Sequence, residues 1–535
     1  MSGRRVLALY GALIFGFAVV VCRLFRVCSD PVYAARAAAQ STVTLTLPAR
    51  RGNFYDCSGQ RLTGLTTRWM ALCIPGEDSY ARLFPYADAA GQAELYRKRN
   101  AAAPFLLEVD RDVSSLGVLC WPVEHRYPDA PLAVQLIGCR NGEGKGAAGL
   151  EAAFDTLLTG SGEGDTLRCT VNAQGKLRTE PELQENDSGA AGVQLTLSRE
   201  IQQTAQAVAE QTMESGCILV LETDTAKIRA CVSLPDYDPE NVSASLETEG
   251  SPLVERALRS YAVGSVFKPV LAAAALEAGQ TDFVYTCPGW CEVDGQIFRC
   301  AGGVPHGEVD LAGALEKSCN GYFIRLGQLL GAERVHAMAQ ALGFGRRVEW
   351  AGTLHTAEGG LPDLSALKSS GAYANFCFGQ GELLAAPVQV AGMMNAIACG
   401  GVYRTPQLVE GEWDEDAGRL CAAAEPGESH RALSEASARA LRELLAGVVE
   451  RGTGREAALP EQTAAGKTGT AQTGQFEAGQ FEAGQERKNH WFAGYFPADA
   501  PRYTIVVLQD ARTDPVCSSA AIFARVAAGL EILTR

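Results

Sequence analysis

The feature that most constrains this chain is the long apolar run near its N-terminus, "VLALYGALIFGFAVVVC", from Val6 to Cys22. No Asp, Glu, Lys or Arg interrupts it. A run of this length crosses the hydrocarbon core of a membrane only as an α-helix, because the bilayer offers no water to exposed backbone N–H and C=O groups. We therefore expect residues 1–28 to form a short cytoplasmic tail and a transmembrane anchor.

Arginines on both sides of the run bear on its orientation. Arg4 and Arg5 precede it, which favours a cytoplasmic N-terminus, and Arg23 and Arg26 follow it, which makes the charge asymmetry weak. A cleaved signal peptide is the alternative, but no small-residue cleavage site closes the run. The sequence thus predicts a single-pass membrane protein with the remaining chain outside the cytoplasm.

Length and charge narrow the classes of protein further. With 535 residues the chain is long enough for two or three domains. Its 47 Lys and Arg residues against 62 Asp and Glu residues give a net charge of −15, so no nucleic acid partner is expected. The 17 cysteines lie scattered, many inside apolar runs, which favours small buried side chains over a disulfide framework.

Changes of pattern divide the chain after the anchor. Residues 29–190 mix β-type runs with Gly-rich joints and are predicted to form a mainly β or mixed pedestal that ends at the linker "ENDSGAAG". Residues 191–535 begin and end with strand patterns and are helical between them, which predicts an α+β domain whose sheet joins its first and last parts. The tandem repeat "GQFEAGQFEAGQ" at 474–485 is predicted to be a solvated loop.

Three short motifs in the larger domain carry chemistry when they are taken together. Ser265 and Lys268 lie in "AVGSVFKPV", Ser318 and Asn320 flank a cysteine in "EKSCNGY", and Lys467 begins "KTGT". The first two are weak alone, because a capped helix or a turn would explain each. The order Ser-x-x-Lys, Ser-x-Asn, Lys-Thr-Gly, however, is that of serine β-lactamases and penicillin-binding proteins.

The residue types suit acyl transfer to a serine. A serine hydroxyl is a weak nucleophile at neutral pH and needs a base within reach. Positions i and i+3 share a helix face, so Lys268 can serve Ser265 if its amine is neutral. Burial or a nearby cation lowers the pKa of a lysine, and Lys467 can supply that cation. Ser318 can relay a proton towards the leaving amine.

The remaining motif residues suit substrate binding. Asn320 can hold the substrate amide, and Gly469 leaves room for a peptide beside its strand. The N–H groups of Ser265, at a helix N-terminus, and of Thr470 can stabilise a developing oxyanion.

The chain resembles the class B penicillin-binding proteins, which are monofunctional peptidoglycan D,D-transpeptidases, over nearly its whole length. "RRGNFYDCSGQRL" is similar to a stretch that follows the anchor in that family, "YAVGSVFKP" to the nucleophile segment, and "HWFAGYFP" to the strand after Lys-Thr-Gly. The departures from the family pattern remove no catalytic group; they include Phe54, Cys57, Val263, Val266 and Ala386. The resemblance implies a penicillin-binding transpeptidase domain with an antiparallel sheet flanked by helices.

The resemblance also implies a substrate and partners. Ser265 would attack the penultimate D-Ala carbonyl of a peptidoglycan stem peptide, and an amine of a second stem peptide would resolve the acyl-enzyme. Thr468 and Thr470 would bind the terminal carboxylate beside Lys467, and β-lactams would acylate Ser265. No cofactor would be needed. A polytopic SEDS-type glycosyltransferase would work beside the chain at the bacterial cell membrane, in division, elongation or sporulation.

Other functions use the same motifs. A D,D-carboxypeptidase or a β-lactamase would hand the acyl group to water, but the anchor and the pedestal favour transpeptidation. A non-catalytic scaffold for a glycosyltransferase is the remaining alternative. The intact set of chemically active residues argues against it, namely Ser265, Lys268, Ser318, Asn320 and Lys467.

A cysteine-rich stretch, "CPGWCEVDGQIFRCAGGVPHGEVD", precedes the second motif. The spacing of Cys287, Cys291, Cys300 and His306 is tolerable for a structural zinc site, and Cys319 lies inside the motif itself. A redox-sensitive disulfide near the active site is a second alternative. Because the resembled family often has a Cys-containing hairpin before His-Gly, we expect reduced structural thiols and no metal.

Overall fold

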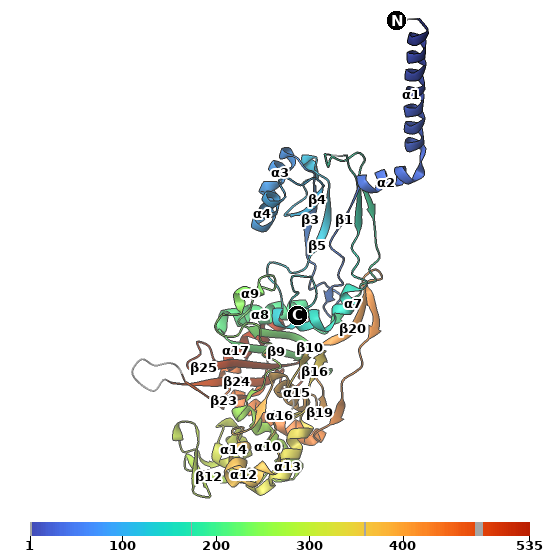
Figure 1. The fold of residues 1–535 in the computed structure, drawn as a ribbon. Helices are drawn as coiled ribbons and strands as arrows, with labels where there is room; N and C mark the ends of the chain where they lie inside the picture. The colour runs from blue at the N-terminus through green and yellow to red at the C-terminus, as the bar shows by residue number, and fades with distance from the viewer. Residues whose placement is uncertain (1–2, 173, 358–359, 477–484, 535) are drawn as a thin grey trace. The chain divides into compact units, whose positions relative to one another are not determined.

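The computed structural model describes residues 3–172, 174–357, 360–476 and 485–534. The chain folds into two compact units (Figure 1). The first comprises Met1–Arg51, Gly64–Arg126 and Thr159–Ala190, and the second comprises Gly52–Thr63, Tyr127–Leu158 and Ala191–Arg535. Apart from its ends, the tandem repeat predicted to be a loop lies outside the described residues.

This division differs from the single boundary near residue 190 that the sequence suggested. Two segments expected in the pedestal, 52–63 and 127–158, belong to the second unit. There β2 (Phe54–Tyr55) pairs with β8 (Gly192–Leu195), and Leu136 is buried in the main core. These contacts join residues far apart in the chain, so the local pattern on either side does not reveal them.

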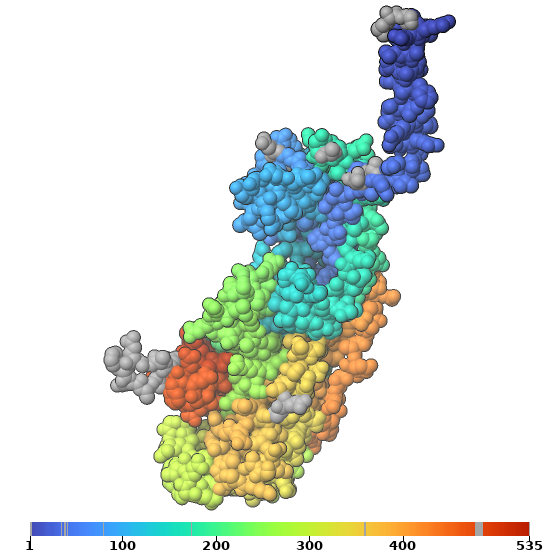
Figure 2. Space-filling model, in the orientation of Figure 1, coloured from blue at the N-terminus to red at the C-terminus, as the bar shows by residue number. Residues whose placement is uncertain are grey.

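The first unit begins with the expected membrane helix. α1 spans Gly3–Ser29 and is long and apolar enough to cross a membrane, by length and composition. None of its residues is buried by the rest of the described chain, and Figure 2 shows its side chains uncovered along its length. α2 (Pro31–Ser41) follows, and the Asp30 carboxylate at its start accepts a hydrogen bond from the Val32 N–H (2.9 Å), as is typical of a helix N-cap.

Two small antiparallel sheets complete the first unit, in keeping with the mixed pedestal expected. Leu83 and Leu95 of its two short helices are buried with Leu107 of one sheet in a core of their own. One sheet has the order β1-β6-β7 and the other β4-β3-β5. The elements are β1 Thr42–Thr46, β3 Thr66–Cys73, α3 Glu77–Leu83, α4 Ala89–Arg97, β4 Phe105–Val109, β5 Cys120–His125, β6 Thr166–Thr170 and β7 Glu182–Gln184.

A five-stranded antiparallel sheet forms the centre of the second unit, with the order β10-β9-β25-β24-β23. β9 and β10 form the predicted hairpin, and β23 lies at one edge. The first and last parts of the domain therefore share one sheet, as the strand patterns at its two ends predicted. The strands are β9 Gly216–Glu222, β10 Ile228–Leu234, β23 Ala465–Phe476, β24 Glu486–Phe496 and β25 Tyr503–Arg512.

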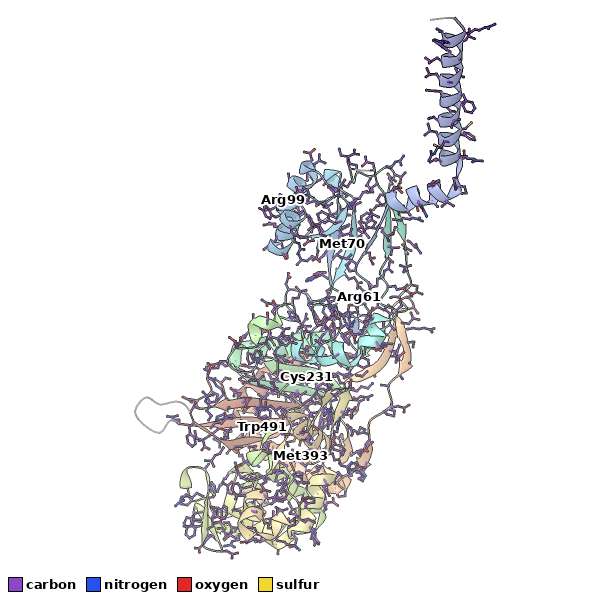
Figure 3. The ribbon with its side chains drawn as sticks, in the orientation of Figure 1. Arg61, Met70, Arg99, Cys231, Met393 and Trp491 are labelled. Atoms are coloured by element: carbon purple, nitrogen blue, oxygen red, sulfur yellow. The ribbon has the colours of Figure 1, made fainter. Side chains whose placement is uncertain are left out.

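Both faces of the sheet are buried along β9, β10 and most of β25, which is why these strands read as nearly continuous apolar runs. Successive side chains point to opposite faces, so Ile218 joins the core under α8 and α17, whereas Leu219 joins the core under α15. Figure 3 labels two members of this second core, Trp491 of β24 and Met393 of α15. The three helices span Arg199–Thr212 (α8), Pro387–Ala398 (α15) and Ser519–Thr534 (α17).

Helices and short hairpins lie between the two halves of the sheet in sequence. The helices are α10 Lys268–Glu277, α11 Leu311–Glu316, α12 Asn320–Leu330, α13 Ala332–Ala341, α14 Ser370–Cys377 and α16 Glu435–Glu450. Two hairpins, β12–β15 and β13–β14, precede α12 and interrupt the stretch that the sequence predicted as helical; their strands are β12 Tyr285–Cys287, β13 Trp290–Val293, β14 Gln296–Arg299 and β15 Gly307–Val309. The remaining short elements are α5 Val134–Ile137, α6 Gly149–Ala153, α7 Asp155–Thr159, α9 Val242–Ser245, β11 Tyr261–Ala262, β16 Glu349–Ala351, β17 Leu354–His355, β18 Leu384–Ala385, β19 Val402–Arg404, β20 Val409–Asp414, β21 Arg419–Ala423 and β22 Ser429–Arg431.

Candidate active site

Ser265 lies in a single 3-10 turn, η3 (Gly264–Phe267), that leads directly into α10. The sequence suggested that the helix begins at Ser265. In the structure it begins at Lys268. A 3-10 turn has about three residues per turn, so positions i and i+3 eclipse one another. The turn therefore keeps Ser265 and Lys268 on one side of the chain. Pro269 is compatible with this start, because N–H groups in the first turn of a helix have no intrahelical partner.

The backbone of η3 is held close to the sheet. Gly264 has a φ of +64°, and a Cβ at this position would lie 2.7 Å from the Thr470 carbonyl oxygen, so the site requires glycine. The Gly264 N–H donates to the Gly379 carbonyl oxygen (2.7 Å), and the Trp491 indole N–H donates to the Ala262 carbonyl oxygen (3.0 Å). The approach to Thr470 places η3 against β23, the strand that carries Lys-Thr-Gly-Thr, and the two hydrogen bonds tie this segment to Gly379 and to β24.

Lys268 is fully buried (0% exposed) and points at the second motif. Its Nζ contacts the Ser318 carbonyl oxygen (2.7 Å), Ser318 Oγ (3.0 Å) and Asn320 Oδ1 (2.7 Å). Burial lowers the pKa of Lys268 to about 7, against a smaller raising effect of Cys319 and Cys300. Of the two causes that the sequence left open, burial and a nearby cation, burial is therefore the main cause of the shift.

A neutral amine is compatible with these three contacts. Its two N–H groups can donate to the two carbonyl-type oxygens, and its lone pair can accept the hydroxyl hydrogen of Ser318. Among the described residues, Lys268 makes no hydrogen bond to the Ser265 hydroxyl. The structure thus brings the base candidate onto Ser318 and Asn320, one turn away from the nucleophile candidate.

The second motif forms the joint between α11 and α12. Ser318 has a φ of +54°, a left-handed conformation that costs a residue with a Cβ about 1–2 kcal/mol. Cys319 is the N-cap of α12, and its sulfur accepts a hydrogen bond from the Tyr322 N–H (3.4 Å). The Asn320 Nδ2 donates to the Arg299 carbonyl oxygen (2.9 Å), which turns Oδ1 towards the lysine amine. The strained turn therefore sets the position of both side chains that contact Lys268.

The third motif lies on β23, and Lys467 is also fully buried (0% exposed). Its Nζ donates to the Thr468 carbonyl oxygen (3.1 Å) and to Thr468 Oγ1 (3.3 Å). Burial, and after it the positive charge of Lys268, holds the pKa of Lys467 well below its usual range. The positive charge of Lys268 thus disfavours the protonated form of Lys467.

Gly469 separates the two threonines of this motif and packs closely against η3. A Cβ on Gly469 would lie 2.9 Å from Val266 Cγ1 and 3.1 Å from the Val266 nitrogen. Glycine here makes room for η3, and the room for a substrate peptide that the sequence suggested stays a prediction. Thr470 is exposed and Thr468 is partly exposed, on the strand that forms the sheet edge. An edge strand can pair with an added extended peptide.

Sequence reasoning missed one residue beside the third motif. Thr453, which follows α16, lies with its Oγ1 2.8 Å from Thr468 Oγ1. Its N–H donates to the Glu316 carbonyl oxygen (3.0 Å), and the Arg451 guanidinium donates to Glu316 Oε1 (2.8 Å). The sequence around it, "ERGTGRE", indicates only a turn, so no local signal could have identified Thr453.

The structure also changes the candidate metal-ligand set. Cys287, Cys300, His306 and Cys319 lie together, with their ligand atoms all within 4.8 Å of one another. Cys291, which the spacing had included, is buried instead in a separate apolar cluster with Val293 of the same strand.

Residues 216–528 match the family described as the penicillin binding protein transpeptidase domain. This match covers more than half of the chain, and the chain belongs to that family. The fold around the three motifs agrees with the family that the sequence resembled.

Relatives and solved structures agree with the assignment. The penicillin-binding protein PbpB of Mycolicibacterium smegmatis is 30% identical over 434 residues, which cover 76% of this chain and 64% of that protein. The chain thus spans less than two thirds of that relative. The peptidoglycan D,D-transpeptidase PbpA of Mycobacterium tuberculosis is 30% identical over 353 residues, 61% of this chain and 69% of that protein. The crystal structure of penicillin binding protein 3 from Mycobacterium tuberculosis, complexed with aztreonam, has a TM-score of 0.66 at 25% identity and covers 92% of this chain and 97% of its own.

Proposed function

We propose that this chain is a peptidoglycan D,D-transpeptidase that cross-links stem peptides through an acyl-enzyme on Ser265. Family membership supports the class of reaction, and the name of the PbpA relative supports the class of substrate. The observation that carries the proposal is the fully buried Lys268 amine, which contacts Ser318 and Asn320 and lies one turn from Ser265.

In the acylation step, the Ser265 oxygen bonds to the carbonyl carbon of the penultimate D-Ala, and its proton passes to the neutral Lys268 amine. The N–H groups of Ser265 and Thr470 stabilise the oxyanion. When the carbonyl re-forms, the C–N bond to the terminal D-Ala breaks, and the departing amine takes the proton through Ser318. The terminal D-Ala leaves, and the stem peptide remains as an ester of Ser265.

In the second step, an amine of a neighbouring stem peptide attacks the ester carbonyl. The new amide forms, and the proton of the attacking amine returns to the Ser265 oxygen through Lys268. Asn320 holds the donor amide, and Lys467 with Thr468 and Thr470 binds the terminal carboxylate. The edge of β23 offers backbone groups that a donor peptide can pair with. A β-lactam, which presents a strained amide in the same position, acylates the same serine.

Labelling with a fluorescent penicillin tests this assignment. The full-length chain in detergent is incubated with the label, and both its attachment and its loss are followed over hours. We expect stable labelling of the wild type and none of Ser265→Ala, because the ester oxygen is then missing. Ser260→Ala, a serine in the same segment, is the matched control and should label like the wild type.

The same experiment separates transfer from hydrolysis. Rapid loss of the label would assign the chain to β-lactam hydrolysis, and a folded wild type that takes no label would contradict the acyl-enzyme. Stem pentapeptide is then supplied with and without an acceptor amine. Formation of the cross-linked amide supports the transpeptidase, whereas release of D-Ala with water as the only acceptor supports a D,D-carboxypeptidase.

The proposal includes a location and a partner. α1 anchors the chain as a single-pass protein of a bacterial cell membrane, with the transpeptidase domain outside the cytoplasm. A SEDS-type glycosyltransferase supplies the uncross-linked glycan strands at the same membrane. Co-purification of such a polytopic protein with the full-length chain, and its loss when α1 is replaced by an unrelated apolar helix, tests this part.

A further inference from the structure

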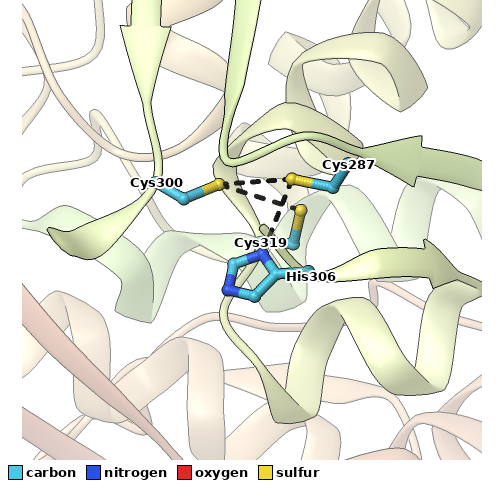
Figure 4. A group of neighbouring side chains, drawn as sticks. All are labelled: Cys287, Cys300, His306 and Cys319. Atoms are coloured by element: carbon cyan, nitrogen blue, oxygen red, sulfur yellow. Dashed lines mark hydrogen bonds between the residues drawn. The ribbon is translucent and has the colours of Figure 1, made fainter. Parts of the chain in front are cut away.

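Four side chains with metal-binding chemistry converge beside the second motif (Figure 4). Cys287 ends β12, Cys300 follows β14, His306 precedes β15, and Cys319 is the N-cap of α12. Three of them are buried, with Cys287 at 1%, Cys300 at 3% and Cys319 at 0% exposure. The cluster therefore draws on a strand end, two residues next to strands and a helix N-cap, and its three sulfurs are shielded from solvent.

Three of the six separations between these ligand atoms are close to those of a tetrahedral site, and all six lie within 4.8 Å. The Cys287 and Cys300 sulfurs are 3.7 Å apart, the Cys300 and Cys319 sulfurs are 4.0 Å apart, and the Cys287 sulfur lies 3.6 Å from His306 Nδ1. Zinc bonds of about 2.3 Å to sulfur and 2.0 Å to nitrogen give ligand separations of about 3.8 Å for two sulfurs and 3.5 Å for sulfur and nitrogen. A zinc ion would thus need little movement of the four side chains.

Backbone N–H groups already point at two of the sulfurs. The Gly289 N–H donates to the Cys287 sulfur (3.4 Å), and the Tyr322 N–H donates to the Cys319 sulfur (3.4 Å) at the N-terminus of α12. Such hydrogen bonds favour the thiolate, which is the form of cysteine that binds a metal. A disulfide between two of these sulfurs would use only two of the four side chains. It would not explain why the third sulfur and the imidazole lie in the same cluster.

We propose that Cys287, Cys300, His306 and Cys319 bind one structural Zn²⁺ ion. Three thiolates and one imidazole complete a closed tetrahedral site with no open position for a water. On binding, the three thiols release their protons to solvent and the imidazole binds in its neutral form. This assignment replaces the sequence expectation of metal-free thiols.

The site would position the second motif. Cys319 stands between Ser318 and Asn320, the two residues that contact the Lys268 amine. Its bond to zinc ties that turn to the hairpin segments that carry Cys287 and Cys300. Loss of the metal should therefore displace the strained Ser318 turn and so change the contacts of the Lys268 amine. Among the described residues, none of the four ligands is hydrogen-bonded to Lys268 directly.

Metal content of the full-length protein is the first test. The chain is purified in detergent without added metal, dialysed against a weak chelator, and measured by elemental mass spectrometry. We expect about one zinc per chain in the wild type and well under half of that in Cys300→Ser. Cys291→Ser, a buried cysteine of the same hairpin region outside the cluster, is the matched control and should keep its zinc.

A spectroscopic readout keeps the test independent of whether a variant folds well. Replacing zinc by Co²⁺ in the wild-type chain should produce the intense sulfur-to-cobalt absorption and the visible bands of a tetrahedral thiolate site. Removing zinc with a strong chelator should slow penicillin labelling about tenfold, and added Zn²⁺ should restore it.

Three results would overturn the proposal. One is a folded wild type that holds no zinc and takes up none when it is offered. Another is an intact mass two hydrogens lighter, with a disulfide mapped within the cluster. The third is stoichiometric iron in place of zinc.

Discussion

At the scale of single residues, the candidate site depends on amines that are kept from water. Lys268 and Lys467 are both fully buried, and burial is the larger cause of the lowered pKa of each. Ser318 and Asn320 give Lys268 three acceptors, which limits the penalty of burying a group that can carry charge. Burial, opposed by the smaller effect of Cys319 and Cys300, lowers the pKa of Lys268 to about 7, where a general base works near neutral pH.

The rate of acylation should therefore depend on pH. Because the pKa of Lys268 is lowered to about 7, the amine is mostly protonated below that pH and cannot accept the Ser265 proton. We expect the rate of penicillin labelling to fall about tenfold per pH unit below pH about 7 and to level off above pH about 8. The measurement is the second-order labelling rate constant of the full-length chain between pH about 5.5 and 8.5.

Lys268→Arg provides the matched comparison for the pH profile. Arginine stays protonated throughout this range, so the variant should label at background at every pH. A wild-type rate that is constant across the range, or that rises towards low pH, would contradict Lys268 as the base.

At the scale of elements, the site is assembled where η3 meets the edge strand β23. The close approach of η3 to β23 depends on glycine at two positions. A Cβ on Gly264 would collide with the Thr470 carbonyl, and a Cβ on Gly469 would collide with Val266. Gly264 lies in the Ser265 segment and Gly469 in Lys-Thr-Gly-Thr, but the reason for both glycines lies in the contact between η3 and β23. A Cβ on Gly264 would meet the Thr470 backbone, whereas a Cβ on Gly469 would meet the Val266 side chain first. A side chain can move more easily than backbone, so Gly469 should tolerate alanine better than Gly264.

Gly469→Ala should push η3 away from β23 and slow penicillin labelling by about tenfold or more, because small displacements of a nucleophile cost much of its effective concentration. The double variant Gly469→Ala, Val266→Ala should recover part of the rate, since it removes the Cγ1 atom that lies 2.9 Å from the new methyl group. The measurement is the labelling rate constant, with circular dichroism as the check on folding.

Gly142→Ala serves as the control for this pair, because nothing lies within 4 Å of a Cβ at Gly142. It should label like the wild type. If Gly469→Ala also labelled at the wild-type rate, the close packing of η3 on β23 would have no part in acylation.

At the scale of the whole molecule, the chain passes between its two units more than once. The first unit takes residues from three segments, and 52–63 and 127–158 fold with the second unit. α1 belongs to the first unit, and its apolar side chains are exposed, with Ile14 at 65% and Phe17 at 72% exposure. The described protein does not cover them, so a membrane is the apolar environment that suits this helix.

Two charges in the middle of α1 should therefore release the chain from membranes. An aspartate at the centre of a spanning helix costs about 3 kcal/mol, so Ile14→Asp with Phe17→Asp should move most of the protein out of the membrane pellet. Ile14→Leu with Phe17→Leu keeps the run apolar and should stay in the pellet. Alkaline extraction of cell membranes is the measurement, and a mature N-terminus found beyond residue 29 would contradict an anchor.

The sequence alone determined the elements whose signals are local. The apolar run predicted α1, and the strand patterns at the ends of the larger domain predicted a sheet that β9, β10 and β23 to β25 form. The order of the three motifs predicted the family, which the comparison confirms. These features follow from residue type, from periods of two and 3.6 residues, and from spacing along one chain.

Only the tertiary structure decided which distant residues meet. It joins 52–63 and 127–158 to the second unit, gives Ser318 its left-handed backbone, and assigns Gly469 to the packing of η3. It also exchanges Cys291 for Cys319 in the metal-ligand cluster, because strand alternation in β13 turns Cys291 into an apolar cluster while the start of α12 brings Cys319 to the hairpins. Each of these outcomes depends on contacts between residues far apart in the chain, and no local pattern encodes them.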